Sequence, residues 1–305
     1  AVAPTSSLRL VAKSATLNTK KKVNFDSAKN MYSVRIILDS INPAGKRLTT
    51  FLCTYPLNVH AELMTHRVFS RNAASARAIP IDKFIATLQS DPVLPVVWRA
   101  NQRGMEAAGD LDEHNSKMCE RVILGMRDEI IKGVKQLQLC NLHKSWVNRY
   151  MQPWMWMTTL ITACDFGNWF DLRADGPAQP EIMVVAYWML KEYLQSQPLE
   201  VYWEDWHIPG LDPYERSILS IDEKLIISTA RAARTSFTKF DAPINLDDAI
   251  RIHGDMVVGG HWSPFEHCAQ AIDVEGGIMG EWRGKDYPWS NFDVNGNCSG
   301  WGQYR

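Results

Sequence analysis

The chain lacks the features that mark several large classes of protein. None of its apolar runs approaches the about 20 residues that a helix needs to cross a bilayer, and its first residues show no apolar signal region and no cleavage pattern. A formal net charge of −1 argues against a strongly basic, nucleic-acid-coating surface. No repeat or low-complexity segment is present. We therefore expect a cytoplasmic protein without a membrane or nucleic-acid partner.

Cysteine patterns that would hold a metal or a disulfide framework are also missing. There is no Cys-x-x-Cys pair, and the six cysteines lie far apart: Cys53, Cys119, Cys140, Cys164, Cys268 and Cys298. In a chain of this length such spacing favours reduced thiols. His261 and His267 are six positions apart, which does not place both on one helix face, and no third ligand accompanies them. We expect no bound metal.

The chain does have ample apolar material for a core. Its 305 residues are 46% hydrophobic and 22% charged, as in an ordinary globular protein. Residues 1–30 are polar and contain Lys20-Lys21-Lys22, which predicts a loosely held arm. We expect a single α/β domain over 31–275 and an irregular tail over 276–305, which is rich in Gly, Trp and Asn.

Local patterns predict a hairpin followed mainly by helices. Two β-rich runs, 33–41 and 48–55, flank the turn sequence Asn42-Pro43-Ala44-Gly45. Pro56 would end the hairpin, and Asn58 would cap a helix that leads into the next motif. Apolar residues at helical spacing predict a long helix between 110 and 139. Further helices are expected at 181–195, 222–234 and 246–258, with a connecting loop at 196–219.

The most informative stretch is Glu62–Arg77, which reads ELMTHRVFSRNAASAR. It contains three arginines, one histidine, two serines and one asparagine among small alanines. A structural helix would carry a leucine stripe or Glu–Lys pairs instead. Guanidinium groups bind phosphates and carboxylates, and small neighbours let a planar ligand approach the backbone. This stretch is therefore a candidate binding motif.

A second cluster lies further along the chain. It runs from Asn168 to Arg173 as NWFDLR and continues with AQPE at 178–181, and Asn148-Arg149 precedes it. Taken alone, Arg173 is better explained by pairing with Asp171 or Asp175 on a helix surface.

The third cluster is HWSPFEH at 261–267, preceded by TARAARTSF at 229–237. Its Ser-Pro-x-Glu pattern predicts a helix start, with Ser263 as N-cap, Pro264 in the first turn and Glu266 at the third helical position. A helix N-terminus also favours a bound phosphate. The segment is therefore a candidate for both roles.

Together the three clusters resemble the signatures of the flavin-dependent thymidylate synthases. Thr65-His66-Arg67, Ser70, Asn72, Ser75 and Arg77 fall at the offsets of that family's Arg-His-Arg motif. The family runs Ser-Pro-Phe-Glu-His first, whereas here that segment comes last, so we interpret the chain as a circularly permuted, divergent, phage-type member. The resemblance covers roughly 60–270. It implies an α/β fold like that of the thymidylate synthase-complementing proteins, with a mixed sheet flanked by helices, and a location in the host cytoplasm if the protein is phage-encoded.

The resemblance also implies roles for individual residues. Catalytic roles are expected for Arg173 and Arg67. Substrate binding is expected for Ser75, Arg77, Arg149, Arg173 and Glu62. Cofactor binding is expected for His66, Arg67, Asn168, His261, Ser263 and Glu266.

Departures from the family pattern concentrate in the first motif. The first Arg of the pattern is Thr65 here, its Gln is Glu62, its Glu is Ala73 and its Tyr is Ala78. A carboxylate at Glu62 would repel a phosphate unless an arginine such as Arg149 neutralised it. We hypothesise that Gln303 and Arg305 fold back and supply the missing amide and guanidinium.

If the resemblance holds, the activity is reductive methylation of dUMP to dTMP. FAD would be the cofactor, NADPH and methylenetetrahydrofolate the co-substrates, and a homotetramer with shared sites the assembly. Two alternatives remain open. One is a related enzyme of the same scaffold that hydroxymethylates its pyrimidine or acts on dCMP. The other is a nucleotide- or flavin-binding homologue without turnover.

Overall fold

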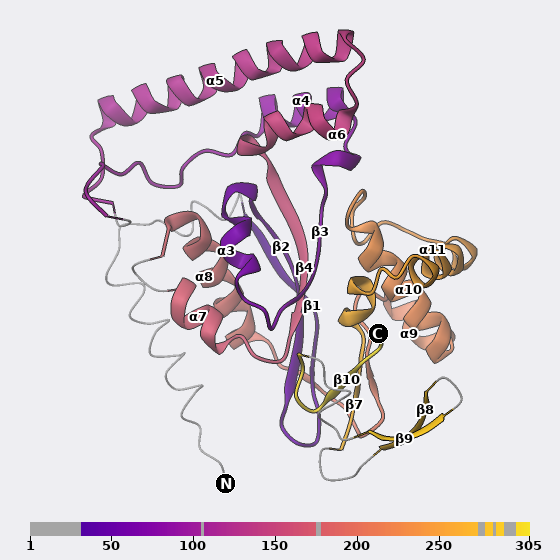
Figure 1. The fold of residues 1–305 in the computed structure, drawn as a ribbon. Helices are drawn as coiled ribbons and strands as arrows, with labels where there is room; N and C mark the ends of the chain where they lie inside the picture. Colours follow the sequence, from indigo (N-terminus) through magenta and orange to yellow (C-terminus); the bar gives the residue numbers. More distant parts are fainter. Residues whose placement is uncertain (1–31, 105–106, 175–177, 274–277, 283–284, 290–296) are drawn as a thin grey trace.

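The chain forms a mixed α/β structure around a five-stranded sheet (Figure 1). The computed structural model describes residues 32–104, 107–174, 178–273, 278–282, 285–289 and 297–305. The strand order is β3-β4-β2-β1-β5, which leaves β3 at an edge. The bounds are β1 (Ser33–Ile41), β2 (Arg47–Pro56), β3 (Ser70–Ala73), β4 (Trp156–Ala163) and β5 (Leu199–Glu200). The strands β1 and β2 form the predicted hairpin, and β5 pairs with β1 in parallel.

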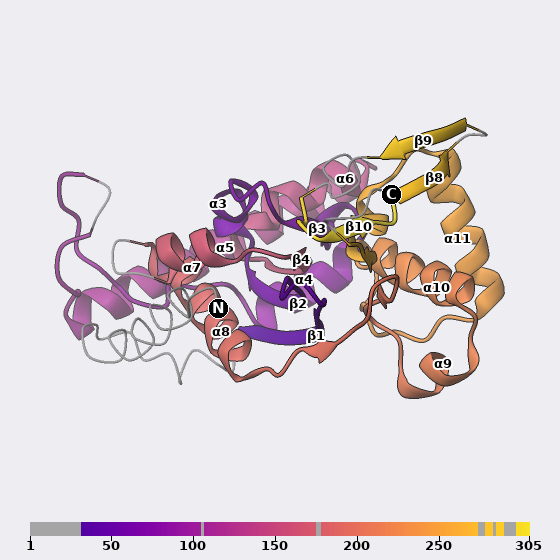
Figure 2. The same cartoon turned by 90° about the horizontal axis from the view of Figure 1, so that it is seen from below.

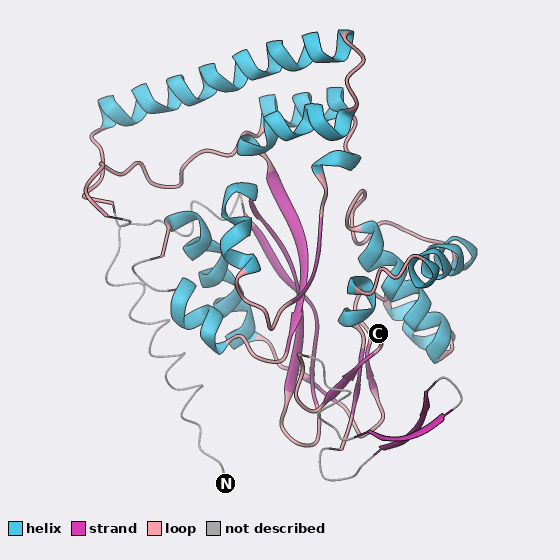
Figure 3. Ribbon diagram, in the orientation of Figure 1, coloured by secondary structure: helices cyan, strands magenta, loops and turns pink. Residues whose placement is uncertain are grey.

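Helices cover both faces of this sheet (Figure 3). On one face Phe51 and Ile161 pack with α7 (Gly167–Arg173) and α8 (Pro180–Gln195). On the other face Leu52 and Leu160 pack toward α10 (Ile221–Arg234). Successive side chains of a strand point to opposite faces, so β2 and β4 each serve both cores.

A helical layer lies across one end of the sheet (Figure 1). It contains α4 (Ile81–Ser90), α5 (Glu113–Leu139), α6 (Lys144–Val147) and the 3-10 helix η3 (Asn148–Trp154). The predicted apolar stripe of α5 is buried only toward the helix C-terminus, where Val134 is 1% exposed. Toward its N-terminus Met118, Val122 and Met126 are 53%, 56% and 51% exposed.

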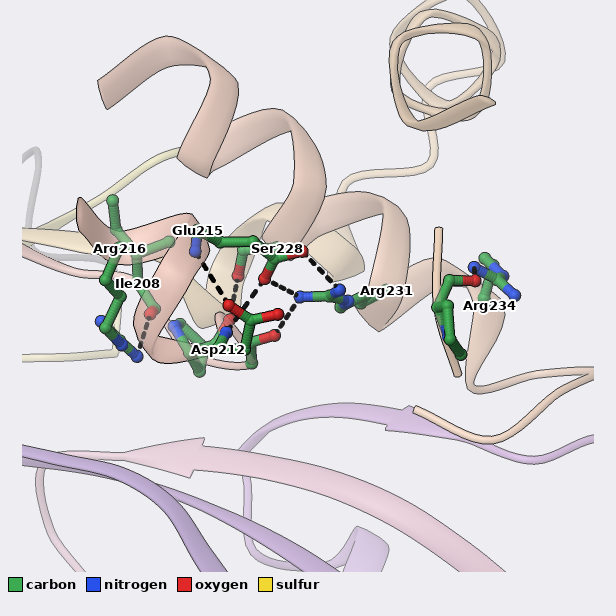
Figure 4. A network of polar contacts seen from close by, with 10 residues as sticks. Ile208, Asp212, Glu215, Arg216, Ser228, Arg231 and Arg234 are labelled. Carbon is green, nitrogen blue, oxygen red and sulfur yellow. Dashed lines mark hydrogen bonds and ion pairs between the residues drawn. The ribbon is translucent and has the colours of Figure 1, made fainter. Parts of the chain in front are cut away.

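A buried ion pair joins the helices α9 (Pro213–Ile218) and α10 (Figure 4). Arg231 donates to both carboxylate oxygens of Glu215, over 2.6 and 2.7 Å, and also contacts the carbonyl of Gly210. Glu215 is the third residue of a capping box with Asp212. Because a buried charge is costly unless paired, removing either partner would loosen this corner. Arg231 therefore has a structural role here.

A smaller sheet has the order β10-β7-β6. Its strands are β6 (Trp206–His207), β7 (Ala269–Ala271) and β10 (Trp301–Gln303). A separate hairpin pairs β8 (Ile278–Trp282) with β9 (Lys285–Trp289). The prediction of an irregular tail over 276–305 is thus wrong for most of its described residues, which lie in β8, β9 and β10.

Several local predictions are confirmed and others need correction. The expected helices at 181–195, 222–234 and 246–258 correspond to α8, α10 and α11 (Leu246–Val258). Asn58 does not cap a helix: it lies inside the 3-10 turn η1 (Leu57–Val59), and α3 (His60–Met64) follows. The expected loop at 196–219 contains β5, β6 and α9. The arm over 1–30 lies outside the described residues. Across the described residues, no helix has the length and apolar character to span a membrane.

Candidate functional site

The first cluster, which includes the edge strand β3, lies between the second cluster on α7 and the third cluster beside α10 (Figures 1 and 2). The strand is short because only Ser70–Ala73 pairs with β4. At its start lies the turn that carries His66, and beside it lies the 3-10 helix η4 (Ser263–His267). Beyond its end lies the 3-10 helix η2 (Ala76–Ala78). The first motif therefore lies between the other two clusters and contacts both of them.

The second cluster reaches the first through Arg173. Its Nε donates to Nε2 of His66 over 3.3 Å, and one terminal nitrogen lies 3.4 Å from Oγ1 of Thr65. Because Nε2 accepts this hydrogen bond, it carries no proton, and the imidazole is neutral. Arg173 thus makes contacts across two elements that the helix-surface interpretation did not predict.

His66 sits in an aromatic setting. Its ring stacks on Phe69 with centroids 5.6 Å apart, and it forms a T-shaped pair with Trp169 with centroids 4.9 Å apart. Burial lowers the pKa of His66, and the positive charges of Arg173 and Arg71 lower it further. Both effects hold the imidazole neutral, so it remains an acceptor for Arg173 at physiological pH.

The third cluster joins the first through His267 and Asn72. Nε2 of His267 accepts from the amide nitrogen of Asn72 over 3.1 Å, and this nitrogen also donates to the carbonyl of Ser263. Ser263 itself is exposed. It does not cap a helix, because Trp262 precedes η4 without a side-chain cap and η4 is a single 3-10 turn. The prediction that Ser263 caps a helix is therefore wrong, and the predicted phosphate site loses the helix N-terminus on which it depended.

A chain of buried polar groups continues from His267 across the sheet. Nδ1 of His267 bonds Thr162, which bonds Thr50, which bonds Nε2 of His207. Nδ1 of His207 then bonds Ser40 over 2.8 Å. Burial lowers the pKa of both histidines to about 3. The chain is therefore made of neutral, mutually satisfied groups that fix η4 and β6 against the sheet.

The predicted nucleotide residues lie near the other end of β3. Arg77 is exposed on η2 and Arg149 is exposed on η3. Asn148, fully buried, donates to the carbonyls of Ala76 and Ile79 and so holds these two turns together. Ser75 is fixed by its backbone N–H, which donates to the carbonyl of Ser236. The exposed guanidinium groups of Arg77 and Arg149 are thus carried by two turns that Asn148 holds together.

The remaining predicted residues are placed less closely. Arg67 is exposed, and its carbonyl accepts from Asn297. Asn168 is exposed one residue before Trp169. His261 is exposed where α11 ends, with its N–H on the carbonyl of Met256. Among the described residues, the buried Oε2 of Glu62 has no hydrogen-bond partner, so Arg149 does not neutralise it here.

The C-terminal residues do fold back onto the first motif. The Gln303 amide donates to Oγ of Ser70 and to the carbonyl of Glu266, both over 3.0 Å. Arg305 pairs with the carboxylate of Glu266 over 2.5 Å. They reach η4 and the start of β3, and no contact joins them to Glu62 or Thr65 in the described structure. The hypothesis that they replace the missing groups near the nucleotide is therefore wrong. They contact the segment that was expected to bind the cofactor.

The sequence did not predict many of the residues that hold the candidate site in place. The motifs predicted no role for Trp169 and Phe69, and the Thr50–Thr162 pair depends on the register between β2 and β4. His207 lies in the segment that was expected to be a loop. The cavity of about 370 Å³ beside Arg231 contains none of the residues that the motifs predict. The threonines at 50, 54, 158 and 162 were a sequence signal for this pairing, because threonines directly opposite each other on neighbouring strands form hydroxyl pairs.

No family model matches the chain, and no curated protein matches it. Two solved structures of PolB, a UMP/dUMP methylase from Streptomyces cacaoi, are similar in part. The one bound with 5-Br UMP has 14% sequence identity and a TM-score of 0.46, over 55% of this chain and 90% of that one. The one bound with 5-Br dUMP has 16% identity and a TM-score of 0.44, over 55% and 91%. Values this low do not assign a family, and the function below is proposed from the residues of the site.

Proposed function

We propose that the protein is a flavin- and folate-dependent pyrimidine nucleotide methylase that converts dUMP to dTMP. The observation that carries this proposal is that both other clusters contact the first motif: Arg173 contacts His66 in the turn before β3, and His267 contacts Asn72 on β3. Three segments that resemble one family's signatures, yet stand in rotated order, meet in one place. Such convergence supports a circular permutation of that family's fold.

The residues present suit FAD. A planar cofactor needs a few fixed polar groups beside an apolar wall. Arg173 and His66 are such polar groups, and Phe69 and Trp169, which are buried in the core, hold the His66 ring in place. A buried acceptor, Oε1 of Gln303, has no protein partner in the described structure and would be free to accept from a donor on a ligand. His66, Arg67, Asn168, His261, Ser263 and Glu266 would hold the cofactor. When bound, FAD would supply hydride transfer from NADPH and relay of the folate carbon.

The protein itself would supply position and charge. Arg173, oriented by neutral His66, would stabilise negative charge that develops on the pyrimidine ring. Ser75, Arg77 and Arg149 would hold the nucleotide, because guanidinium groups on fastened turns are suited to phosphate. Holding the reacting groups in place is itself a large contribution to rate. The buried Oε2 of Glu62, which has no partner among the described residues, is suited to accept from a donor on the ligand.

A homotetramer with shared sites remains part of the proposal. The exposed stripe Met118, Val122 and Met126 on α5 supports it, because contiguous apolar helix surface is commonly covered by a partner. A second copy of the chain would also explain why Arg77 and Arg149 project outward.

The test begins with an absorbance scan of purified protein near the flavin bands, before and after addition of FAD. The protein is then incubated with dUMP, methylenetetrahydrofolate and NADPH, and the product is weighed. A product with the mass of dTMP supports the proposal. A hydroxymethylated product, or turnover only with dCMP, would favour the related-enzyme alternative. Flavin binding without turnover would indicate a binding homologue, and a colourless protein that takes up no FAD would contradict the proposal.

A further inference from the structure

The C-terminal segment 301–305 is firmly built into the fold. The indole of Trp301 is fully buried and donates from Nε1 to the carbonyl of Lys46. Backbone pairing continues along β7 from Trp301 to Gln303, and the N–H of Tyr304 donates to Cys268. Just before the segment, Gly300 has a φ of +80°, and Asn42 donates to its carbonyl. A position that favours glycine and a buried tryptophan thus fix where Gln303 and Arg305 lie.

Gln303 bridges two parts of the candidate site. Its Nε2 donates to Ser70 on β3 and to the carbonyl of Glu266 on η4, while its Oε1 is buried without a partner among the described residues. One half of the amide therefore fastens the strand to the turn. The other half is a buried acceptor, and buried acceptors are normally satisfied.

Arg305 changes the charge of the same place. Its guanidinium pairs with Glu266, whose side chain is 17% exposed. Glu266 also interacts electrostatically with the half-buried Arg71 on β3. One carboxylate thus faces two guanidinium groups, and the repulsion that it would exert on an anionic ligand is offset.

We propose that the segment 301–305 is a wall of the cofactor subsite, in which Gln303 contacts the ligand and Arg305 makes the subsite acceptable to a phosphate-bearing cofactor. This inference rests on the proposed function, since it takes FAD as that cofactor. The segment is then a ligand-binding element for the cofactor, and it leaves the nucleotide positions at Arg77 and Arg149 to the other end of β3.

The test compares FAD and dUMP affinities by fluorescence titration and equilibrium dialysis, without turnover. Gln303→Ala should weaken FAD binding about tenfold. Arg305→Ala should weaken it about threefold, with a smaller salt dependence than in the wild type, and Arg305→Lys should recover most of the loss. Gln270→Ala is the matched control, because Gln270 lies on the adjacent strand β7 and donates only to the carbonyl of Glu204. It should leave FAD affinity unchanged.

The outcomes separate this inference from the proposed function. Wild-type protein that binds no FAD overturns both. Wild-type protein that binds FAD, with Gln303→Ala and Arg305→Ala both within twofold of it, overturns this inference alone. A loss of dUMP affinity with FAD affinity intact also overturns it, since it would place the segment at the nucleotide. Arg305→Ala keeps the test decisive if Gln303→Ala misfolds, because the Arg305 side chain is 47% exposed.

Discussion

Nε of Arg173, near the end of α7, donates to Nε2 of His66 over 3.3 Å, and His66 stands in the turn that precedes β3. The imidazole is positioned in turn by Phe69 and Trp169, which leave it little freedom to rotate. The neutral His66 ring thus restricts the rotamers that the Arg173 guanidinium can adopt. The pair ties together two motifs that are far apart in the sequence.

Arg173→Lys should lower kcat for dUMP methylation by about 10²- to 10³-fold, because lysine keeps the charge but loses the planar fork. The measurement is steady-state turnover followed by product mass. Arg121→Lys, at an exposed position on α5, is the control and should retain full activity. Equal rates for Arg173→Lys and the wild type would remove Arg173 from the catalytic machinery.

Arg173→Ala should raise the pKa of His66. The positive guanidinium disfavours protonation of the neighbouring imidazole, so its removal favours the charged form. Burial continues to lower the pKa in the variant, which leaves part of the shift in place. The measurement is the NMR titration of the His66 ring. A titration curve unchanged by the substitution would show that the two groups do not interact in solution.

Stability should fall as pH decreases below about 6.5. His207 and His267 have folded-state pKa values of about 3 because they are buried. Between about 3 and 6.5 the unfolded chain therefore binds protons that the folded chain does not, and each histidine costs up to about 1.4 kcal/mol per pH unit. Urea unfolding at several values between pH 7.5 and 5 measures this slope.

Two variants assign that slope to the buried chain. His267→Gln should reduce it by the share of one histidine, whereas His114→Gln, at an exposed position on α5, should preserve it. An unfolding free energy that stays constant from pH 7.5 to 5 would show that these histidines titrate normally.

Asn148→Ala should destabilise the protein by about 2–4 kcal/mol, because the carbonyls of Ala76 and Ile79 lose their donor in a buried setting. It should also weaken dUMP binding, since η2 and η3 carry Arg77 and Arg149. Chemical unfolding and nucleotide titration measure the two effects. Asn101→Ala, on an exposed loop, is the control. Weakened stability with unchanged dUMP affinity would separate these turns from the nucleotide.

Met118→Glu together with Met126→Glu should dissociate the proposed tetramer. Both side chains lie in the exposed stripe of α5, and a buried charge at an apolar interface is costly. Light scattering after size exclusion measures the mass. Lys135→Glu changes the charge of the same helix at an exposed position that lies on the opposite side from Met126, and it should leave the assembly intact. An unchanged mass in the double variant would place the interface elsewhere.

Local sequence was sufficient for elements whose signal is contained within their own residues. The hairpin of β1 and β2 has two β-rich runs around turn residues, and α8, α10 and α11 show helical spacing of apolar residues. The motif residues were also visible as a type, because arginines beside alanine and serine are unusual in a structural helix. These features depend on neighbours a few positions away.

Only the tertiary structure decided how the motifs meet. Strand β3 exists because β4 pairs with it, and β10 exists because β7 does, so neither is visible in its own short sequence. The Arg173–His66 contact, the buried chain through His267 and the return of Gln303 to Ser70 all join residues from distant segments. Such contacts depend on register and packing, and a one-residue slip would turn each side chain to the opposite face. The sequence alone determined which groups are available for binding, and the fold decided which of them act together.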